Sequence, residues 1–338
     1  MTTDPDQRTY DTLRLLAEHE AIGSVRLTEQ LRERGYSITE RTVRLTLSDL
    51  DEAGLTEKVG GKGRRLTDEG RAELERGGVR GRIEQVRERL AELTSQVTYD
   101  PAADDGDVVV GTVTVPEAKR PRVREILDTI DESALGPATF SLESVDRNGT
   151  DCLEIAAASS VTIDGILLAN GIETDLDTTG IVEYSPTTDS TSRDDSDSVG
   201  RGGTIRRFTD VIGDERATLD LVSLLIEARR TTVERALAGE PGLLVADNRE
   251  FPLTHYRTAR ELAVATRDRL GGVIDLRRPR EPGPFPWGQP GWSFASLTCV
   301  GSAEIVISRF VEAGIAVEWE TLAGVRPRSE LSAVGTTE

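Results

Sequence analysis

The sequence predicts a mixed α/β protein, of the α/β or the α+β kind, in which an N-terminal winged helix-turn-helix precedes a larger second domain. Three short amphipathic stretches followed by a glycine-rich hairpin fill residues 8–76, and from residue 107 apolar strands alternate with helices. The chain has 338 residues, more than one core usually supports. We expect a winged helix over 8–76, a connector over 77–106 and a mixed domain over 107–328.

The first block contains three helices, each with one apolar face. Ser24 and Thr39 are the residue types that begin helices by accepting backbone hydrogen bonds, and Gly54 is a typical stop. The apolar positions at helical spacing are Tyr10, Leu13, Leu16 and Ala17 in the first helix, Leu27 and Leu31 in the second, and Val43, Leu47 and Leu50 in the third.

A hairpin with a basic tip follows these helices. Residues 55–59 and 64–66 have strand character and flank the turn sequence Gly60–Gly63, and Thr67 is placed to begin a short helix to Arg76. The segment 58–65 contains Lys58, Lys62, Arg64 and Arg65, four cations with no acid. Three helices and such a hairpin make a winged helix-turn-helix.

Residues 79–97 form a further helix, with Ile83, Val86, Leu90 and Leu93 on one face. Two interpretations are open at this point. The helix is a connector or a dimer-forming helix, or it packs on its own winged domain.

From residue 107 the expected strands are 107–115, 139–145, 152–158, 242–246, 272–276, 293–300 and 315–319, and the expected helices are 118–130, 162–170, 216–238, 258–270 and 302–312. No internal repeat is visible. We expect a disordered loop at 185–203, which is almost free of apolar residues. The five prolines of 279–292 predict a stiff loop. Its aromatic rings either line a ligand pocket or dimer contact, or fix the loop to the core.

The charge of −19 is unevenly distributed. Residues 1–100 contain 17 basic and 20 acidic residues, and the remaining chain contains 24 and 40. The excess of acids and the presence of only three lysines suggest a halophilic, salt-adapted protein, although high-GC coding would also favour arginine. The acidity argues against a general nucleic-acid coat.

The composition excludes several classes of protein. Two cysteines cannot make a disulfide framework, and with only two histidines beside them we expect no Cys/His metal cage. We therefore expect no metal and no cofactor. No apolar run is long enough for a membrane span, and the acidic N-terminus is no secretory signal. We expect a cytoplasmic protein with no membrane partner.

The third helix and the hairpin supply the candidate DNA contacts. In a winged helix-turn-helix the start of the third helix enters the major groove, where Arg, Thr and Ser contact bases or phosphates, and cations on the wing contact phosphates. The candidates are Thr39, Arg41, Thr42, Arg44, Ser48, Lys58, Lys62, Arg64 and Arg65. The alternative is a winged helix that binds protein.

Several segments resemble the NrpR family, archaeal repressors of nitrogen-assimilation genes. They are ITERTVR at 38–44, LDEAGL at 50–55, KVGGKGRRLT at 58–67, GRI at 81–83, TYDP at 98–101, TIDGILLANGI at 162–172 and NREFP at 248–252. The resemblance covers most of residues 8–325. It implies a dimeric DNA-binding repressor that is released by 2-oxoglutarate and has a ribonuclease R-type winged helix. Members of the family often carry two regulatory domains, whereas this chain has room for one.

A 2-oxoglutarate site needs arginine and hydroxyl or backbone donors, preferably at a helix N-terminus. Ser159, Ser160 and Thr162 stand between a predicted strand and a predicted helix, and Arg249 is predicted to follow a strand. These four residues are the candidate effector site. The structural alternatives are that Thr162 only begins its helix and that Arg249 forms a surface salt bridge.

We therefore predict a ligand-responsive transcriptional regulator that binds an inverted-repeat operator as a homodimer. No catalytic residues are predicted: no phosphate-binding glycine loop is present, and Cys152 and Cys299 lie in apolar strands. The rival class is an enzyme or interaction module with an accessory winged helix.

Overall fold

The computed structural model describes residues 7–19, 21–33, 38–60, 63–71, 74, 88–147, 149–186, 203–213, 220–281 and 293–333. The chain forms two compact units, which divide between Gln85 and Val86. No helix in these ranges is long and apolar enough to cross a membrane.

The first unit is a winged helix-turn-helix. Its elements are α1 (Gln7–Ala17), α2 (Ser24–Glu33), α3 (Glu40–Glu52), β1 (Thr56–Val59) and β2 (Gly63–Leu66). The predicted apolar stripe of α3, Val43, Leu47 and Leu50, is buried together with leucines of α1 and α2. Burial of one face of each helix gives this small unit its core.

The wing is an antiparallel hairpin joined to the helices by backbone bonds. Thr56 pairs with Leu66 and Val59 with Gly63. Arg64 also exchanges two backbone hydrogen bonds with Ile22, each 2.9 Å long, so the segment before α2 lies along β2. These bonds fix the base of the wing to the helices.

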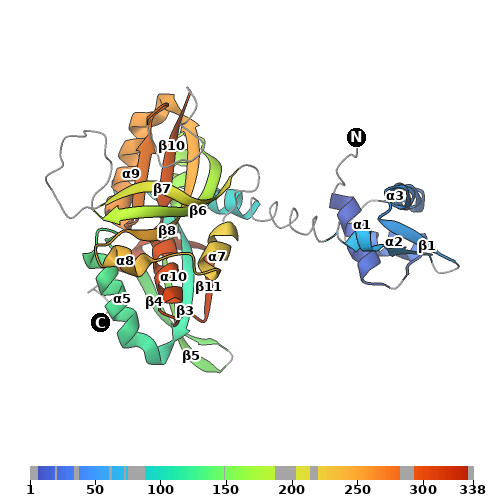
Figure 1. Ribbon diagram of the computed structural model, residues 1–338, viewed down its shortest axis with the longest axis horizontal. Coiled ribbons are helices and arrows are strands. Elements are labelled where there is room, and N and C mark those ends of the chain that lie inside the picture. The colour runs from blue at the N-terminus through green and yellow to red at the C-terminus, as the bar shows by residue number, and fades with distance from the viewer. Residues whose placement is uncertain are drawn as a thin grey trace. The chain divides into compact units, whose positions relative to one another are not determined.

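The second unit contains two halves of the same design (Figure 1). The first half comprises β3 (Asp107–Pro116), η1 (Glu117–Lys119), α5 (Arg120–Glu132), β4 (Thr139–Arg147), β5 (Thr150–Ala158), α6 (Thr162–Ala169) and β6 (Asp175–Pro186). The second comprises β8 (Gly242–Pro252), η3 (Leu253–His255), α9 (Tyr256–Leu270), β9 (Val273–Arg277), β10 (Phe294–Val300), α10 (Ser302–Glu312) and β11 (Glu318–Pro327).

The other elements of this unit are β7 (Gly203–Gly213), α7 (Asp220–Glu227), α8 (Val233–Leu237), η4 (Arg328–Glu330) and β12 (Ser332–Ala333). The two five-stranded sheets have the orders β7-β6-β8-β10-β9 and β11-β3-β5-β4-β12. Every paired strand runs antiparallel, so the second unit is mixed α/β with antiparallel sheets.

The two halves exchange a strand. β3-β5-β4 and β8-β10-β9 have the same order, while β6 of the first half pairs with β8 and β11 of the second half pairs with β3. The expectation of no internal repeat was therefore wrong at the level of structure. When the two halves are aligned on Pro116 and Pro252, polar and apolar residues face each other at several positions, such as Val113 of β3 and Arg249 of β8, so the repeat is hard to see in the sequence.

The helix at 88–96 belongs to the second unit. Leu93 and Val97 are buried in its core, and a Cβ at Gly165 of α6 would lie 2.3 Å from the Val97 Cβ. Glycine at 165 thus lets this helix lie directly on α6. The described part of the helix therefore packs on the second unit.

Several predicted elements differ from the observed ones. The strand predicted to end at Ala246 continues to Pro252, and β6 and β7 were not predicted. The polar run 247–250 led to the early end predicted for β8. In β6, bulges at Ile181/Val182 and Glu183/Tyr184 break the alternation of buried and exposed residues that predicts a strand. The predicted helix 216–238 is two helices, α7 and α8, within the described residues.

Two predicted loops fall mainly outside the described residues. Of the segment 185–203, Ser185, Pro186 and Gly203 are strand residues, which corrects the ends of the predicted loop, and 187–202 are not described. Of the proline-rich segment 279–292, only Pro279–Glu281 and no tryptophan is described.

Candidate functional site: a DNA-binding face and a buried polar network

The first candidate site is the exposed side of α3. Thr39 begins the helix, since its hydroxyl accepts the Thr42 N–H at 3.3 Å. The Thr39 and Thr42 hydroxyls also lie 2.9 Å apart, so these two residues share the capping role. Arg41 is exposed and Ser48 is half-buried on the same helix. A helix N-terminus with a cation and hydroxyls is suited to contact with a polyanion.

The predicted cations of this unit occupy three different environments. Among the described residues, Arg41 and Lys58 are exposed and have no ion-pair partner, whereas Lys62 lies outside the described residues. Arg44 pairs with Glu40, and Arg65 pairs with Glu57 at 2.6 Å, both on the surface. Exposed pairs contribute little stability, so these two arginines can exchange partners at low cost.

Arg64 has a different, internal role. Its Nε donates to both carboxylate oxygens of Asp51, at 2.9 and 3.1 Å, and only 18% of its side chain is exposed. The Thr56 hydroxyl donates to the same carboxylate at 2.7 Å. Asp51 at the end of α3 therefore holds both strands of the wing. Arg64 fixes the angle between wing and helix.

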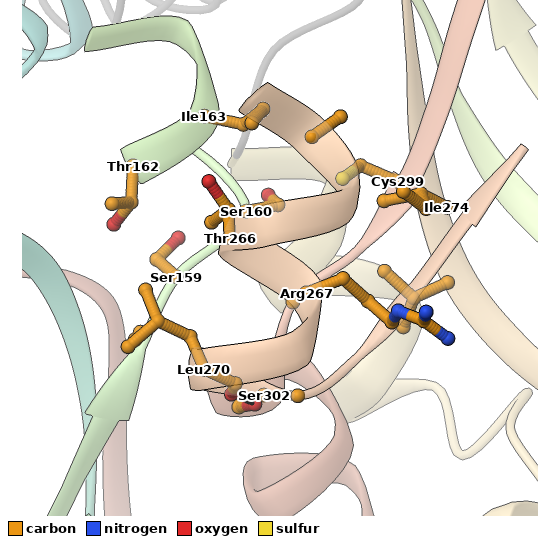
Figure 2. Close-up of a pocket in the computed structure, with 15 residues that line it drawn as sticks. Ser159, Ser160, Thr162, Ile163, Thr266, Arg267, Leu270, Ile274, Cys299 and Ser302 are labelled. Atoms are coloured by element: carbon orange, nitrogen blue, oxygen red, sulfur yellow. Dashed lines mark hydrogen bonds between the residues drawn. The ribbon is translucent and has the colours of Figure 1, made fainter. Parts of the chain in front are cut away.

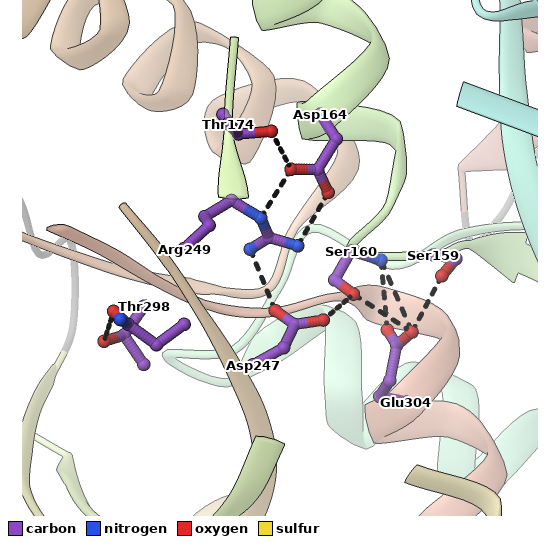
Figure 3. A network of polar contacts seen from close by, with 9 residues as sticks. Ser159, Ser160, Asp164, Thr174, Asp247, Arg249, Thr298 and Glu304 are labelled. Atoms are coloured by element: carbon purple, nitrogen blue, oxygen red, sulfur yellow. Dashed lines mark hydrogen bonds and ion pairs between the residues drawn. The ribbon is translucent and has the colours of Figure 1, made fainter. Parts of the chain in front are cut away.

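The second candidate site is a buried network in the second unit (Figure 3). The Arg249 side chain of β8 is completely buried between two carboxylates. Its Nε and Nη2 lie 2.7 and 2.8 Å from the two oxygens of Asp164, and its Nη1 donates to Asp247 at 2.9 Å. The Thr174 hydroxyl donates to Asp164 at 2.8 Å. The arginine thus joins β8 to the first turn of α6.

The same network continues to the first turn of α10. The Ser160 hydroxyl donates to Asp247 at 2.6 Å, and the Ser159 hydroxyl donates to Glu304 at 2.8 Å. The Ser160 backbone N–H points at Glu304, 3.3 Å from Oε2. A Cβ at Gly301 would lie 2.3 Å from the Ser160 nitrogen, so the two turns touch. The turn before α6 already holds a carboxylate, which comes from the protein itself.

Burial shifts the pKa values of the network. Burial raises the pKa of Asp164 despite the neighbouring Arg249, and burial together with Asp247 raises the pKa of Glu304 to about 7. Burial opposes the charge of Arg249, but Asp164 and Asp247 together raise its pKa above the usual range. Arg249 therefore stays charged, and Glu304 titrates near neutrality.

A pocket adjoins this network (Figure 2). The space in it that the centre of a water molecule can reach is about 30 Å³. Ser159, Ser160 and Thr162 line one side and α9 lines the other, where Arg267 extends away from the serines. Thr162 itself bonds to Val109, since its hydroxyl lies 3.1 Å from both the nitrogen and the oxygen of that residue.

The structure brings three of the four candidate effector residues together at the pocket and connects the fourth through Asp247. Arg249 lies within β8 and not after a strand, which corrects the sequence prediction. Sequence reasoning missed Asp164, Asp247 and Glu304. Asp164 lies within the segment at 162–172 that resembles the family, which is the one signal that was present.

Two further observations concern chemistry. Cys152 and Cys299 are buried, and burial raises the pKa of the Cys299 thiol well above its usual range. In the described ranges, no group of three or more His, Cys, Asp or Glu side chains is placed to hold a metal ion.

Comparison with known proteins follows the division into two units. Residues 11–74 match the ribonuclease R winged-helix domain, and residues 83–192 and 200–333 match the NrpR regulatory domains NRD1 and 2. The chain belongs to the NrpR family. The resemblance seen in the sequence is thereby confirmed.

Relatives in the family are named as nitrogen regulators. The global nitrogen regulator NrpRI of Methanosarcina mazei is 28% identical over 80% of this chain and 81% of its own length. NrpR of Methanocaldococcus jannaschii is 29% identical over 73% of this chain and 42% of its own length, and NrpR of Methanococcus maripaludis is 27% identical over 78% and 44%. The chain thus spans four fifths of the first and less than half of the other two.

The fold also has a solved counterpart. A nitrogen repressor-like protein from Methanococcus jannaschii has a TM-score of 0.55 at 21% identity, over 74% of this chain and 98% of that one. The protein is an NrpR-family regulator, and the relatives confirm the prediction of a regulator over that of an enzyme.

Proposed function

We propose that this NrpR-family protein is a cytoplasmic, salt-adapted repressor of nitrogen-assimilation genes, which binds an inverted-repeat DNA operator as a homodimer. The observation that carries the proposal is the exposed N-terminal half of α3, where Arg41 has no acidic partner among the described residues and Lys58 extends from the wing. One winged helix reads few base pairs, and a two-fold pair doubles the contacts.

A small anion such as 2-oxoglutarate is proposed to release the protein from DNA. The turn before α6 supplies donors that a carboxylate needs, because it holds the Glu304 carboxylate through the Ser159 hydroxyl and the Ser160 N–H. An effector with two carboxylates would take the place of Glu304 at Ser159, Ser160 and Thr162 and draw on Arg249. The network is acid-rich, so a dianionic effector can enter only if Glu304 is displaced or takes up a proton from solvent.

The proposal includes a route from this turn to the DNA-binding unit. The helix at 88–96 follows the winged helix in the chain and lies against Gly165 of α6. A shift of α6 would move this helix and thereby alter the separation of two recognition helices in a dimer. The half-sites of an operator require a fixed separation.

A gel-shift titration tests DNA binding. The full chain is compared with the double variant Arg41→Ala/Arg44→Ala on promoter DNA and on a scrambled duplex, over a KCl series up to molar salt. The wild type is expected to prefer the promoter and the variant to lose that preference. Absence of any preference in the wild type at every salt concentration contradicts the proposal.

Isothermal calorimetry tests the effector. Titration with 2-oxoglutarate at millimolar concentration is expected to give heat in the wild type and less in Ser159→Ala. The control Ser95→Ala changes an exposed serine and is expected to behave as the wild type. No heat in the wild type removes 2-oxoglutarate as the effector and leaves the DNA-binding proposal intact.

A further inference from the structure

The outward face of α3 can be located from its buried face. Val43, Leu47 and Leu50 are buried, and the position opposite them on a helix of 3.6 residues per turn is occupied by Leu45. Leu45 is 56% exposed. Arg41 lies one turn before it on the same face, and this is the face that a winged helix turns toward DNA.

Charge divides this face into two parts. Arg41 and Ser48 flank Leu45, while Asp49 and Glu52 follow on the same side and are exposed. The negative carboxylates at the C-terminal end repel phosphate, whereas the helix N-terminus attracts it. DNA contact is therefore confined to the segment from Arg41 to Ser48, which spans about 10 Å, or about three base-pair steps.

Leu45 is the apolar group in the middle of that segment. A single exposed leucine is common on protein surfaces and indicates nothing by itself. Its position between Arg41 and Ser48 places it in the middle of the segment that faces DNA. In the major groove a leucine can make no hydrogen bond, and the thymine 5-methyl is the apolar group that a base edge presents there.

We propose that Leu45 is a specificity-determining residue that contacts a thymine 5-methyl group, with Arg41 directed at a neighbouring base pair one to two steps away. The inference rests on the proposed DNA-binding function. It assigns to each operator half-site a thymine whose methyl group contributes to affinity.

Deoxyuridine substitution isolates this contact, because deoxyuridine differs from thymidine only by the methyl group. The full chain first selects duplexes from a random library, and each thymine of the selected site is then replaced singly. One position in each half-site is expected to lose about four-fold in affinity, the value for burial of one methyl group.

The variant Leu45→Ala completes a double-mutant cycle. It is expected to bind the thymine site more weakly than the wild type and to lose nothing further on deoxyuridine at that position. Leu and Ala both favour helices and the Leu45 side chain lies mostly in solvent, so the variant is expected to keep its thermal unfolding midpoint. Val25→Ala is the matched control, because Val25 of α2 is 57% exposed. It is expected to keep the deoxyuridine effect.

The outcomes separate the two levels of the proposal. If the wild type selects a site but tolerates deoxyuridine everywhere, or if Leu45→Ala stays equally sensitive, Leu45 does not read thymine and the DNA-binding function stands. If Leu45→Ala instead weakens every duplex alike, the leucine has no role in specificity. If no duplex is selected at any salt concentration, both proposals fail together.

Discussion

Arg41 and Arg249 are the same residue type in opposite surroundings. Arg41 is exposed on the winged unit and, among the described residues, has no acidic partner. Arg249 is completely buried in the second unit between Asp164 and Asp247. An exposed arginine is directly available to an outside anion, whereas a buried one is held by the acids that balance its charge and reaches an outside anion only when that anion displaces one of them. The difference separates a surface that binds from a network that holds two halves of a fold together.

The largest effect is expected on stability, when the buried Arg249 is replaced. Arg249→Met leaves Asp164 and Asp247 facing each other without a cation, and is expected to lower the free energy of unfolding of the second unit by about 3–5 kcal/mol. Chemical denaturation of the full chain measures it. The control Arg122→Met removes an arginine from an exposed pair with Glu125 and is expected to cost less than about 1 kcal/mol. Equal losses of unfolding free energy in the two variants would show that the buried arginine is no more important for stability than the exposed one.

The exposed arginine is expected to affect binding and not stability. Arg41→Ala should weaken the selected DNA site by about 1–3 kcal/mol while leaving the unfolding midpoint unchanged, because a base contact is lost. Lys58→Ala should weaken all duplexes alike and reduce the salt slope by about one. Fluorescence anisotropy over a salt series measures both. If Arg41→Ala loses the same affinity for every duplex, this arginine contacts phosphates and not a base.

Arg64 lies between these extremes, being half-buried against Asp51. Asp51→Asn removes the charge that holds Arg64 and is expected to destabilise the first unit by about 1–2 kcal/mol. Glu57→Gln, which affects the exposed pair with Arg65, should cost less. Hydrogen exchange of the Leu66 amide reports opening of the wing. Equal protection in both variants would show that Asp51 does not hold the wing.

The last expected effect is a pH dependence of the free energy of unfolding. The pKa of Glu304 is about 7 in the folded protein, above its ordinary value, so the native state binds the proton more tightly than the unfolded chain. The contribution of Glu304 to stability is present below pH 4.5 and is lost as the pH rises toward 7. Glu304→Gln should therefore show a flatter decline between pH 5 and 7, measured by denaturation at each pH. If Glu304→Gln keeps the wild-type dependence of the free energy of unfolding on pH, another group is responsible for that dependence.

The winged helix could be predicted closely because its signals are local. The Thr39 cap, the buried stripe of α3 and the hairpin around Gly60 depend on neighbouring residues. The environment of Arg64 could not be predicted, because it depends on Asp51, thirteen residues away and on another element. A run of cations in sequence does not show which of them is already paired.

The second unit was less predictable because its organisation is non-local. α10 was predicted with its observed bounds, but the exchange of β6 and β11 between the halves depends on pairing across the whole domain. Counted from Pro116 and Pro252, Gly111 and Val113 of one half stand where the other has Asp247 and Arg249. Such differences hide the repeat, and they place Asp247 and Arg249 in one sheet where the other has Gly111 and Val113.

The central claim is that the winged unit reads a two-fold symmetric DNA site. Selection of random duplexes by the full chain, followed by sequencing, tests it most directly. The predicted result is an inverted repeat whose half-sites lie about one helical turn apart, and whose enrichment disappears with Arg41→Ala. The contradicting result is a wild-type pool with no enriched sequence at any salt concentration, or one in which the variant selects the same site equally well.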